Sequence, residues 1–385
     1  MNPRIGIVLN SFSGGGAERS ALITAGAWPD PKAAILVACI AEGPYSSAVP
    51  ESLKTAELCT WPKLANLRRF SLSLNEVAET HRIGVWIANG YGLTHMVLLS
   101  RLFRPKPDTR IVVVERAHLS RALAHRFTNP LARWAVLRLT RWLYRRADAI
   151  VGVSDGVSRD LERTLGLPTG SVITIHNPVD TEHIAQAIEG PIPDELERAF
   201  GALRAPVVIT TGRLVEQKAH RDLLAAFAGL PQDRRGSLVI LGEGPLRQAL
   251  ERQADRLGIR DRVWMPGFVD NPWWFIARSD VFALSSHWEG HPRAILEALA
   301  CNTPIVSTDC PSGPREILAD APGAQLTPVG DTHALTRSII RLLSDRVAVD
   351  VDLTRYRPAN VARRYAAIAA RVGEDAHLLG YRPPA

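Results

Sequence analysis

Two glutamates in one segment are the most chemically informative residues of the sequence. Glu289 follows the apolar run Val281–Leu284, and Glu297 lies more than a turn into the helix expected to begin near Pro292. A carboxylate on an apolar helix face is costly unless a partner satisfies it. A vicinal diol such as a ribose would offer two donors to Glu297, and a neighbouring Arg is the structural alternative.

Two cations form a second candidate site. Arg213 and Lys218 follow the apolar run Val207–Thr211, with Gly212 at the junction. An Arg fork and a mobile Lys ammonium at the end of a strand suit a diphosphate. The alternative is an exposed basic loop.

Glycine-rich turns follow two of the expected strands. The stretch Ser11–Arg19 contains three consecutive glycines that include Gly15 and Gly16, and Gly242 opens the turn after Leu238–Leu241. Glycine permits sharp turns and close approach of a ligand to the backbone, and a following helix offers free N–H groups to an anion. The first turn matches neither a P-loop nor a GxGxxG pattern, and a plain tight strand–helix turn is the alternative for it.

These motifs must be positioned by an α/β framework, because short β-branched runs alternate with longer helical stretches. We expect a first sheet from Ile5–Asn10, Ala33–Ile40, Val85–Ala88, Arg110–Glu115, Ala149–Val153 and Val172–Ile175. A second sheet would take Val207–Thr211, Leu238–Leu241, Val263–Met265, Val281–Leu284 and Ile305–Ser307. With 385 residues the chain is long enough for two domains. We place them at 1–182 and 183–361, with a C-terminal helix at 362–385 packing back on the first.

The composition narrows the class of protein. The net charge of +7 and pI of about 9.5 favour an anionic partner. No apolar run approaches the length of a membrane-spanning helix, the N-terminus lacks a secretory-signal layout, and the four Cys show no metal-ligand spacing. We therefore expect a cytoplasmic protein without a metal site, and we read Asp350-Val351-Asp352 as a coincidental match to a metal-binding Asp-x-Asp.

A basic region lies between Arg101 and Arg146, where twelve Lys/Arg oppose only Asp108 and Glu115. Within it, 129–147 is expected to form a helix. We expect its apolar residues to pack on the first sheet, with contact to an anionic membrane surface as the alternative, and we expect its Arg side to attract phospholipid or an anionic glycolipid. A solvated basic surface is the alternative for the region as a whole. The apolar residues are Leu131, Ala135, Leu139, Trp142 and Leu143, and the Arg residues are Arg138, Arg141 and Arg145.

Together these motifs resemble the family 4 glycosyltransferases of the GT-B fold. The resemblance spans nearly the whole chain, from the glycines before Arg19 through Asn177-Pro178-Val179-Asp180 at the linker to the pair Glu289/Glu297. It implies two doubly wound Rossmann-like domains facing an interdomain cleft, with the nucleotide-sugar donor held by the second. His291, where many relatives carry an apolar residue, departs from the common pattern.

The resemblance also implies roles for individual residues. Arg213 and Lys218 would bind the donor diphosphate, Glu297 the ribose hydroxyls, and Glu289 with Gly290 and His291 the transferred sugar. His118, which follows Arg110–Glu115, resembles the first-domain His near the reacting sugar in many relatives; a structural His is the alternative. The remaining donor-site residues would be Gly15, Gly16, Gly212, Gly242, Phe268, Val269 and Pro292.

The function implied is retaining, metal-independent transfer of a hexose or N-acetylhexosamine from a nucleotide sugar. A UDP-sugar is favoured as co-substrate, no other cofactor is expected, and the acceptor would be a glycan, lipid-linked or lipopolysaccharide-type molecule. We expect peripheral contact with the inner face of an anionic cytoplasmic membrane. A sugar-nucleotide epimerase of the same architecture is the alternative. A nucleic-acid partner is not expected, since the sequence has no aromatic single-strand platform or DNA-binding motif.

Overall fold

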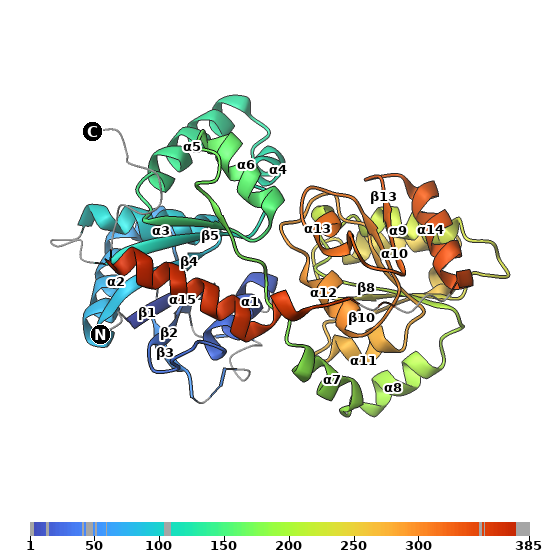
Figure 1. The fold of residues 1–385 in the computed structure, drawn as a ribbon. Coiled ribbons are helices and arrows are strands. Elements are labelled where there is room, and N and C mark those ends of the chain that lie inside the picture. Colours follow the sequence, from blue (N-terminus) through green and yellow to red (C-terminus); the bar gives the residue numbers. More distant parts are fainter. Residues whose placement is uncertain are drawn as a thin grey trace. The chain divides into compact units, whose positions relative to one another are not determined.

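The computed structural model describes residues 4–12, 15–40, 42–43, 49–50, 52–58, 60–103, 109–345, 349 and 351–374. The expectations for Gly14, Cys59, Asp350 and the chain after residue 374 lie outside these ranges. The chain divides into two compact units, Met1–Pro178 with Thr354–Ala385, and Val179–Leu353 (Figure 1). The expected domain limits at 182 and 361 lie further along the chain than the observed limits at 178 and 353.

The first unit contains a parallel sheet with the strand order β3-β2-β1-β4-β5-β6-β7. Its inner strands are almost entirely buried, which explains their near-continuous runs of Val, Ile, Leu and Ala. The strands are β1 (Arg4–Ser11), β2 (Ala34–Ile40), β3 (Lys54–Glu57), β4 (Ile83–Asn89), β5 (Arg110–Glu115), β6 (Ala149–Gly152) and β7 (Ile173–Thr174).

Helices cover this sheet. The first α-helix packs beside the last one, α15, which also contacts β4 and β5, and α3 packs against β1, β4 and β5 (Figure 1). The chain therefore returns to the first unit after completing the second. The helices are α1 (Gly16–Gly26), α2 (Leu67–His81), α3 (Tyr91–Ser100), α4 (Leu119–Arg126), α5 (Pro130–Tyr144), α6 (Asp155–Leu165) and α15 (Pro358–Glu374).

The second unit contains a parallel sheet with the order β10-β9-β8-β11-β12-β13. Its strands are β8 (Val207–Thr211), β9 (Ser237–Leu241), β10 (Val263–Gly267), β11 (Val281–Leu284), β12 (Ile305–Thr308) and β13 (Ala324–Thr327). Its helices are α7 (Thr181–Glu189), α8 (Asp194–Gly201), α9 (His220–Ala228), α10 (Arg247–Arg256), α11 (Pro272–Ala277), α12 (Arg293–Ala300), α13 (Pro314–Leu318) and α14 (Thr332–Asp345).

Every strand expected from the sequence is present, and two additional strands lie at sheet edges. These are β3 and β13, whose residues are mostly half-buried or exposed. In each sheet the order reverses direction once, between β1 and β4 and between β8 and β11. Ligands of open α/β sheets bind at such switch points, outside the carboxyl ends of the strands.

The expectation for the apolar face of α5 was wrong. Leu143 is buried, but Leu131, Leu139 and Trp142 are exposed, and Ala135 is exposed as well. The helix instead buries Thr140, Leu143 and Tyr144. Two of these inner side chains are polar and find partners, since Thr140 bonds to Tyr91 and His95 and the Tyr144 hydroxyl donates to Glu115. The inward face therefore does not stand out as the apolar one in the sequence.

Candidate functional site

The switch point of the second unit brings together the candidate donor residues. The loop after β8 carries Gly212, Arg213 and Lys218, and the loop after the neighbouring strand β11 carries Glu289. Strand pairing alone thus places the two cations and the carboxylate at the same edge of the sheet.

Glycine is required where the loops after β8 and β9 meet. Gly212 and Gly242 both have positive φ, of 152° and 132°. A Cβ on Gly242 would lie 2.1 Å from the Gly212 carbonyl oxygen, and one on Gly244 would lie 2.5 Å from that of Leu214. The two loops therefore pack backbone against backbone, and a Cβ on Gly212 would lie 3.4 Å from Lys218 Cε.

Lys218 and Glu289 form an ion pair, with 2.7 Å between Nζ and Oε1. The same carboxylate oxygen accepts a hydrogen bond from the Ser286 hydroxyl at 2.6 Å. Glu289 is buried and Lys218 is half-buried. A partly desolvated pair of this kind fixes both groups, so Lys218 reaches the switch point with a defined position.

Arg213 differs from Lys218. Its side chain is exposed, and no ion pair or hydrogen bond joins it to another of the described residues. Phe268 and Val269, which follow β10, are exposed and half-buried. The Arg213 guanidinium and the Phe268 ring are therefore exposed to solvent at this edge of the sheet.

Glu297 is buried on α12 and pairs with Arg293 one turn earlier, at 3.0 Å between Nη2 and Oε1. This contact is the structural alternative recognised from the sequence. A role toward ribose hydroxyls stays a prediction, and in such a role Arg293 would hold the carboxylate in place.

The loop around Gly290, His291 and Pro292 is buried and lies against the loop after β12. The Glu289 amide donates to the Pro311 carbonyl, and the Ser312 amide donates to the Glu289 carbonyl. Pro292 is the N-terminal cap of α12, so the helix begins at Arg293, one residue after the position expected for its start. The two loops thus fix the backbone that carries Glu289.

In the first unit, Gly15 and Gly16 lie at the end of β1, beside its switch point with β4. Gly15 precedes α1 and Gly16 is its first residue. The Glu18 side chain folds over Gly15, since a Cβ there would lie 2.3 Å from Oε2. The amino end of α1 thus already faces a carboxylate.

Arg116, which the sequence analysis did not single out, also lies at this edge. Its guanidinium donates to Asn89 Oδ1 at 2.7 Å and to Asn177 Oδ1 at 2.6 Å. These acceptors are neutral amides, so the cationic charge is held without a direct carboxylate contact in this cluster. Three separate chain segments supply it, and no local pattern in the sequence marks it.

His118 is buried at the start of α4 and lies against α6. Its Nδ1 lies 3.2 Å from Asp160 Oδ2 and 3.2 Å from Ser120 Oγ. Burial lowers the pKa of His118, and Asp160 offsets part of that shift. An ionised carboxylate only accepts hydrogen bonds, so Asp160 favours a neutral imidazole protonated on Nδ1 and leaves Nε2 as an acceptor. Asp160 was not predicted, because a lone acid on an amphipathic helix carries no local signal.

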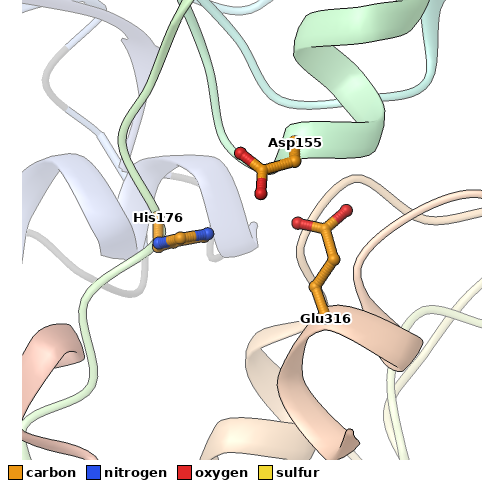
Figure 2. A group of neighbouring side chains, drawn as sticks. All are labelled: Asp155, His176 and Glu316. Atoms are coloured by element: carbon orange, nitrogen blue, oxygen red, sulfur yellow. The ribbon is translucent and has the colours of Figure 1, made fainter.

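The linker end of the first unit contains a second His. Figure 2 shows His176 on the segment after β7 and Asp155 at the start of α6, and it labels Glu316, which belongs to α13 of the second unit. Burial, followed by the charge of Arg355, lowers the pKa of His176 to about 4. His176 is therefore neutral near pH 7, and its ring meets Tyr356 edge-on with 5.5 Å between centroids.

Comparisons with known proteins match both units to family models. Residues 14–183 match "Glycosyltransferase Family 4", and residues 194–362 match "Glycosyl transferases group 1". The two models together cover most of the chain.

Among curated relatives, the chain is 30% identical over 251 residues to N-acetylgalactosamine-N,N'-diacetylbacillosaminyl-diphospho-undecaprenol 4-alpha-N-acetylgalactosaminyltransferase of Campylobacter jejuni, covering 65% of this chain and 64% of that protein. It is 37% identical over 141 residues to the lipopolysaccharide core biosynthesis glycosyltransferase LpsE of Rhizobium meliloti, covering 37% and 40%. The matches thus span less than two thirds of these relatives.

Among solved structures, Anabaena HepE in complex with UDP and glucose superposes with a TM-score of 0.73 at 21% identity, covering 96% of this chain and 95% of that one. At this identity the similarity establishes the shared fold of two parallel-sheet domains. The two family models match the same two units, one model to each.

Proposed function

This chain belongs to the family 4 glycosyltransferases of the GT-B fold, and we propose that it transfers a hexose or N-acetylhexosamine from a nucleotide sugar to a glycan, lipid-linked or lipopolysaccharide-type acceptor. The names of the Campylobacter and Rhizobium relatives support an acceptor of this class. The UDP bound to HepE supports a UDP-sugar as donor.

The observation that carries the proposal is the cation pair at the switch point of the second sheet. Lys218 is held by Glu289 at 2.7 Å, and Arg213 is exposed one residue after Gly212. A departing nucleoside diphosphate gains negative charge in the transition state. Preorganised cations at that position stabilise the transition state more than the ground state.

We propose roles for the other residues of the site in the same way. Glu297, steadied by Arg293, would accept from the ribose hydroxyls, and Phe268 with Val269 would contact the base. Glu289 and the backbone at Gly290, His291 and Pro292 would contact the transferred sugar. Gly242 would allow the diphosphate to approach the loop after β9.

The first unit would supply the acceptor side. Gly15 and Gly16 would lie near the phosphate and the acceptor, and His118, oriented by Asp160, would face the reacting sugar. We propose that transfer retains the anomeric configuration, with the acceptor attacking the face that the leaving diphosphate occupies. In that chemistry the protein's cations assist departure, no protein nucleophile is needed, and we propose that no metal ion takes part.

The proposal includes a place in the cell. An enzyme that draws on nucleotide sugars and glycosylates a lipid-linked acceptor would work in the cytoplasm at the inner face of the membrane. The basic stretch between Arg101 and Arg146 supports contact with anionic lipid.

A transfer assay tests the proposal. The protein is incubated with radiolabelled UDP-glucose, UDP-galactose, UDP-N-acetylglucosamine or UDP-N-acetylgalactosamine, with and without a bacterial glycolipid extract. We expect label to enter the lipid fraction with one donor and UDP to be released in equal amount. Conversion of the donor to an epimer without any acceptor would instead identify a sugar-nucleotide epimerase.

A further inference from the structure

The exposed face of α5 carries four large apolar side chains. Leu131 is 75% exposed, Trp134 59%, Leu139 46% and Trp142 40%. Large apolar side chains exposed singly are ordinary, whereas four on one side of one helix form a patch that marks an interaction surface.

Arginines share this face with the apolar side chains. Positions 131, 134, 138, 142 and 145 recur at intervals of three and four residues, so Arg138 and Arg145 lie on the same side of the helix as the two Trp. The Arg138 guanidinium lies 5.1 Å from the Trp134 ring centroid, and that of Arg146 lies 3.7 Å from Trp142. Charge and apolar surface are thus interleaved rather than segregated.

Acidic residues are absent from the segment 119–147 itself, which contains seven Arg. Asp148, which follows it, pairs with Arg101 and Arg110. Arg101 also donates to the carbonyl oxygen of Arg146, which places the short helix Arg101–Phe103 beside the end of α5. Leu102 and Phe103 of that short helix are 62% and 45% exposed and extend the apolar surface.

We propose that this face of α5, with Leu102 and Phe103, docks on an anionic lipid bilayer. Trp and Leu would enter the boundary between headgroups and acyl chains, and the Arg residues would pair with lipid phosphates. The two kinds of side chain together favour a bilayer over a nucleic acid, whose backbone would engage the Arg residues and leave Leu131 and Leu139 in water. Through this surface the proposed enzyme would reach a lipid-linked acceptor, and in this respect the inference rests on the proposed function.

The inner face of α5 keeps the helix in this orientation. Thr140 and Tyr144 are buried and hydrogen-bonded to His95 and Glu115 at 2.9 and 2.7 Å, so rotating the helix would break these bonds in the interior. Turning the exposed Trp and Leu side chains away from solvent would therefore cost free energy.

Vesicle flotation of the full-length protein tests the proposal. Vesicles of phosphatidylcholine mixed with phosphatidylglycerol are compared with vesicles of phosphatidylcholine alone, at low and moderate salt. We expect binding to the anionic vesicles only. The double variant Trp134→Ser/Trp142→Ser should reduce the partition coefficient on the order of tenfold or more, and Arg138→Glu/Arg141→Glu should reduce it similarly and remove the salt dependence.

Matched controls lie on and beside α2. Trp61 is 46% exposed, and Arg68 and Arg69 are exposed, so Trp61→Ser and Arg68→Glu/Arg69→Glu make the same chemical changes elsewhere on this unit. These variants should float like the wild type. Equal loss in the α5 and control variants would overturn the assignment to α5, and so would no binding to either vesicle or binding to duplex DNA that matches the vesicle binding at the same salt.

A nucleotide measurement separates this inference from the proposed function. The shift in melting temperature caused by UDP should be the same in the wild type and the α5 variants. Loss of vesicle binding with an intact UDP shift supports the docking surface. Vesicle binding without any nucleotide shift would leave the surface standing and remove the proposed donor site.

Discussion

At the scale of single residues, the contact between Lys218 and Glu289 is central to the proposed chemistry. Lys218 Nζ lies 2.7 Å from Glu289 Oε1, and the Ser286 hydroxyl donates a hydrogen bond to the same carboxylate oxygen. A bound diphosphate would compete with Glu289 for the ammonium. The carboxylate would therefore have two effects in the proposed enzyme, since it positions Lys218 and would repel the phosphate charge.

The variant Glu289→Gln separates these effects. It removes the negative charge and keeps the shape, so UDP should bind at least as tightly as to the wild type. Transfer should nevertheless slow by about tenfold or more, because the sugar and Lys218 are less well positioned. Calorimetry with UDP and a UDP-release assay check the two arms, and UDP affinity reduced in step with turnover would contradict this division of roles.

Asp160 is expected to act through His118. The variant Asp160→Asn removes the charge that raises the imidazole pKa, so burial lowers that pKa further. We expect kcat to fall roughly tenfold or more, the donor KM to stay unchanged, and the acidic limb of the pH profile to move to lower pH. An unshifted profile would show that Asp160 has only a packing role.

At the scale of elements, Ala219 stores strain in the loop that carries Lys218. It has φ 47° and ψ 39°, a left-handed conformation that costs a non-glycine residue about 1–2 kcal/mol. The Ser285 hydroxyl donates to the carbonyls of Lys218 and Ala219 at 3.0 Å and holds the turn. A side chain from the loop after β11 thus holds this geometry in a residue that does not favour it.

The variant Ala219→Gly should relieve this strain. After the greater unfolded-state entropy of Gly is subtracted, we expect a gain of about 0.5–1 kcal/mol and a melting temperature higher by about 1–4 °C. Asn302, with φ 57°, is the matched control, since its side chain accepts from the Val349 amide and Asn tolerates this conformation. A gain in Asn302→Gly but not in Ala219→Gly would contradict the account.

The packing of α5 on β5 predicts a pH dependence of stability. Burial raises the pKa of Glu115 from 4.5 to about 7, against the hydrogen bonds from Tyr144 and Arg116. Between these two values the folded protein holds a proton that the unfolded chain has released. The free energy of unfolding contributed by this group therefore falls as pH rises from about 4.5 to about 7.

The variant Glu115→Gln removes this titration. Between pH 5 and pH 8 the wild type should lose stability relative to the variant, by an amount on the order of 3 kcal/mol. The melting temperatures of both proteins at the two pH values measure this loss. The contributions of other titrating groups cancel because they are common to the wild type and the variant. Parallel pH profiles would show that Glu115 is already ionised in the folded state at pH 5.

At the scale of the whole molecule, the strands that the sequence predicts correctly are those marked by a local run of apolar residues. Inner strands such as Val207–Thr211 and Val281–Leu284 were located to the residue because both faces are buried and the run is continuously apolar. The edge strands Lys54–Glu57 and Ala324–Thr327 are mostly exposed or half-buried and gave no such run.

What the sequence did not predict depends on tertiary contacts. Helical periodicity groups Leu131, Leu139 and Trp142 on one side, but only the folded unit shows that this side faces solvent while Thr140 and Tyr144 face inward. Similarly, Arg116 and Asp160 gain their partners from distant segments. Loop residues such as Arg213, Lys218 and Glu289 can be singled out from the sequence because strand ends and glycines mark them locally, and their roles stay predictions.

The central claim is that the second unit holds the donor diphosphate through Arg213 and Lys218. Calorimetric titration of UDP into the wild type, Arg213→Ala, Lys218→Ala and the control Arg337→Ala, an exposed cation on α14, tests it most directly. Each lost charged contact is worth about 1.5–3 kcal/mol, so both site variants should raise Kd roughly ten- to hundredfold while Arg337→Ala leaves it unchanged. UDP binding that all three variants retain at wild-type strength would contradict the account.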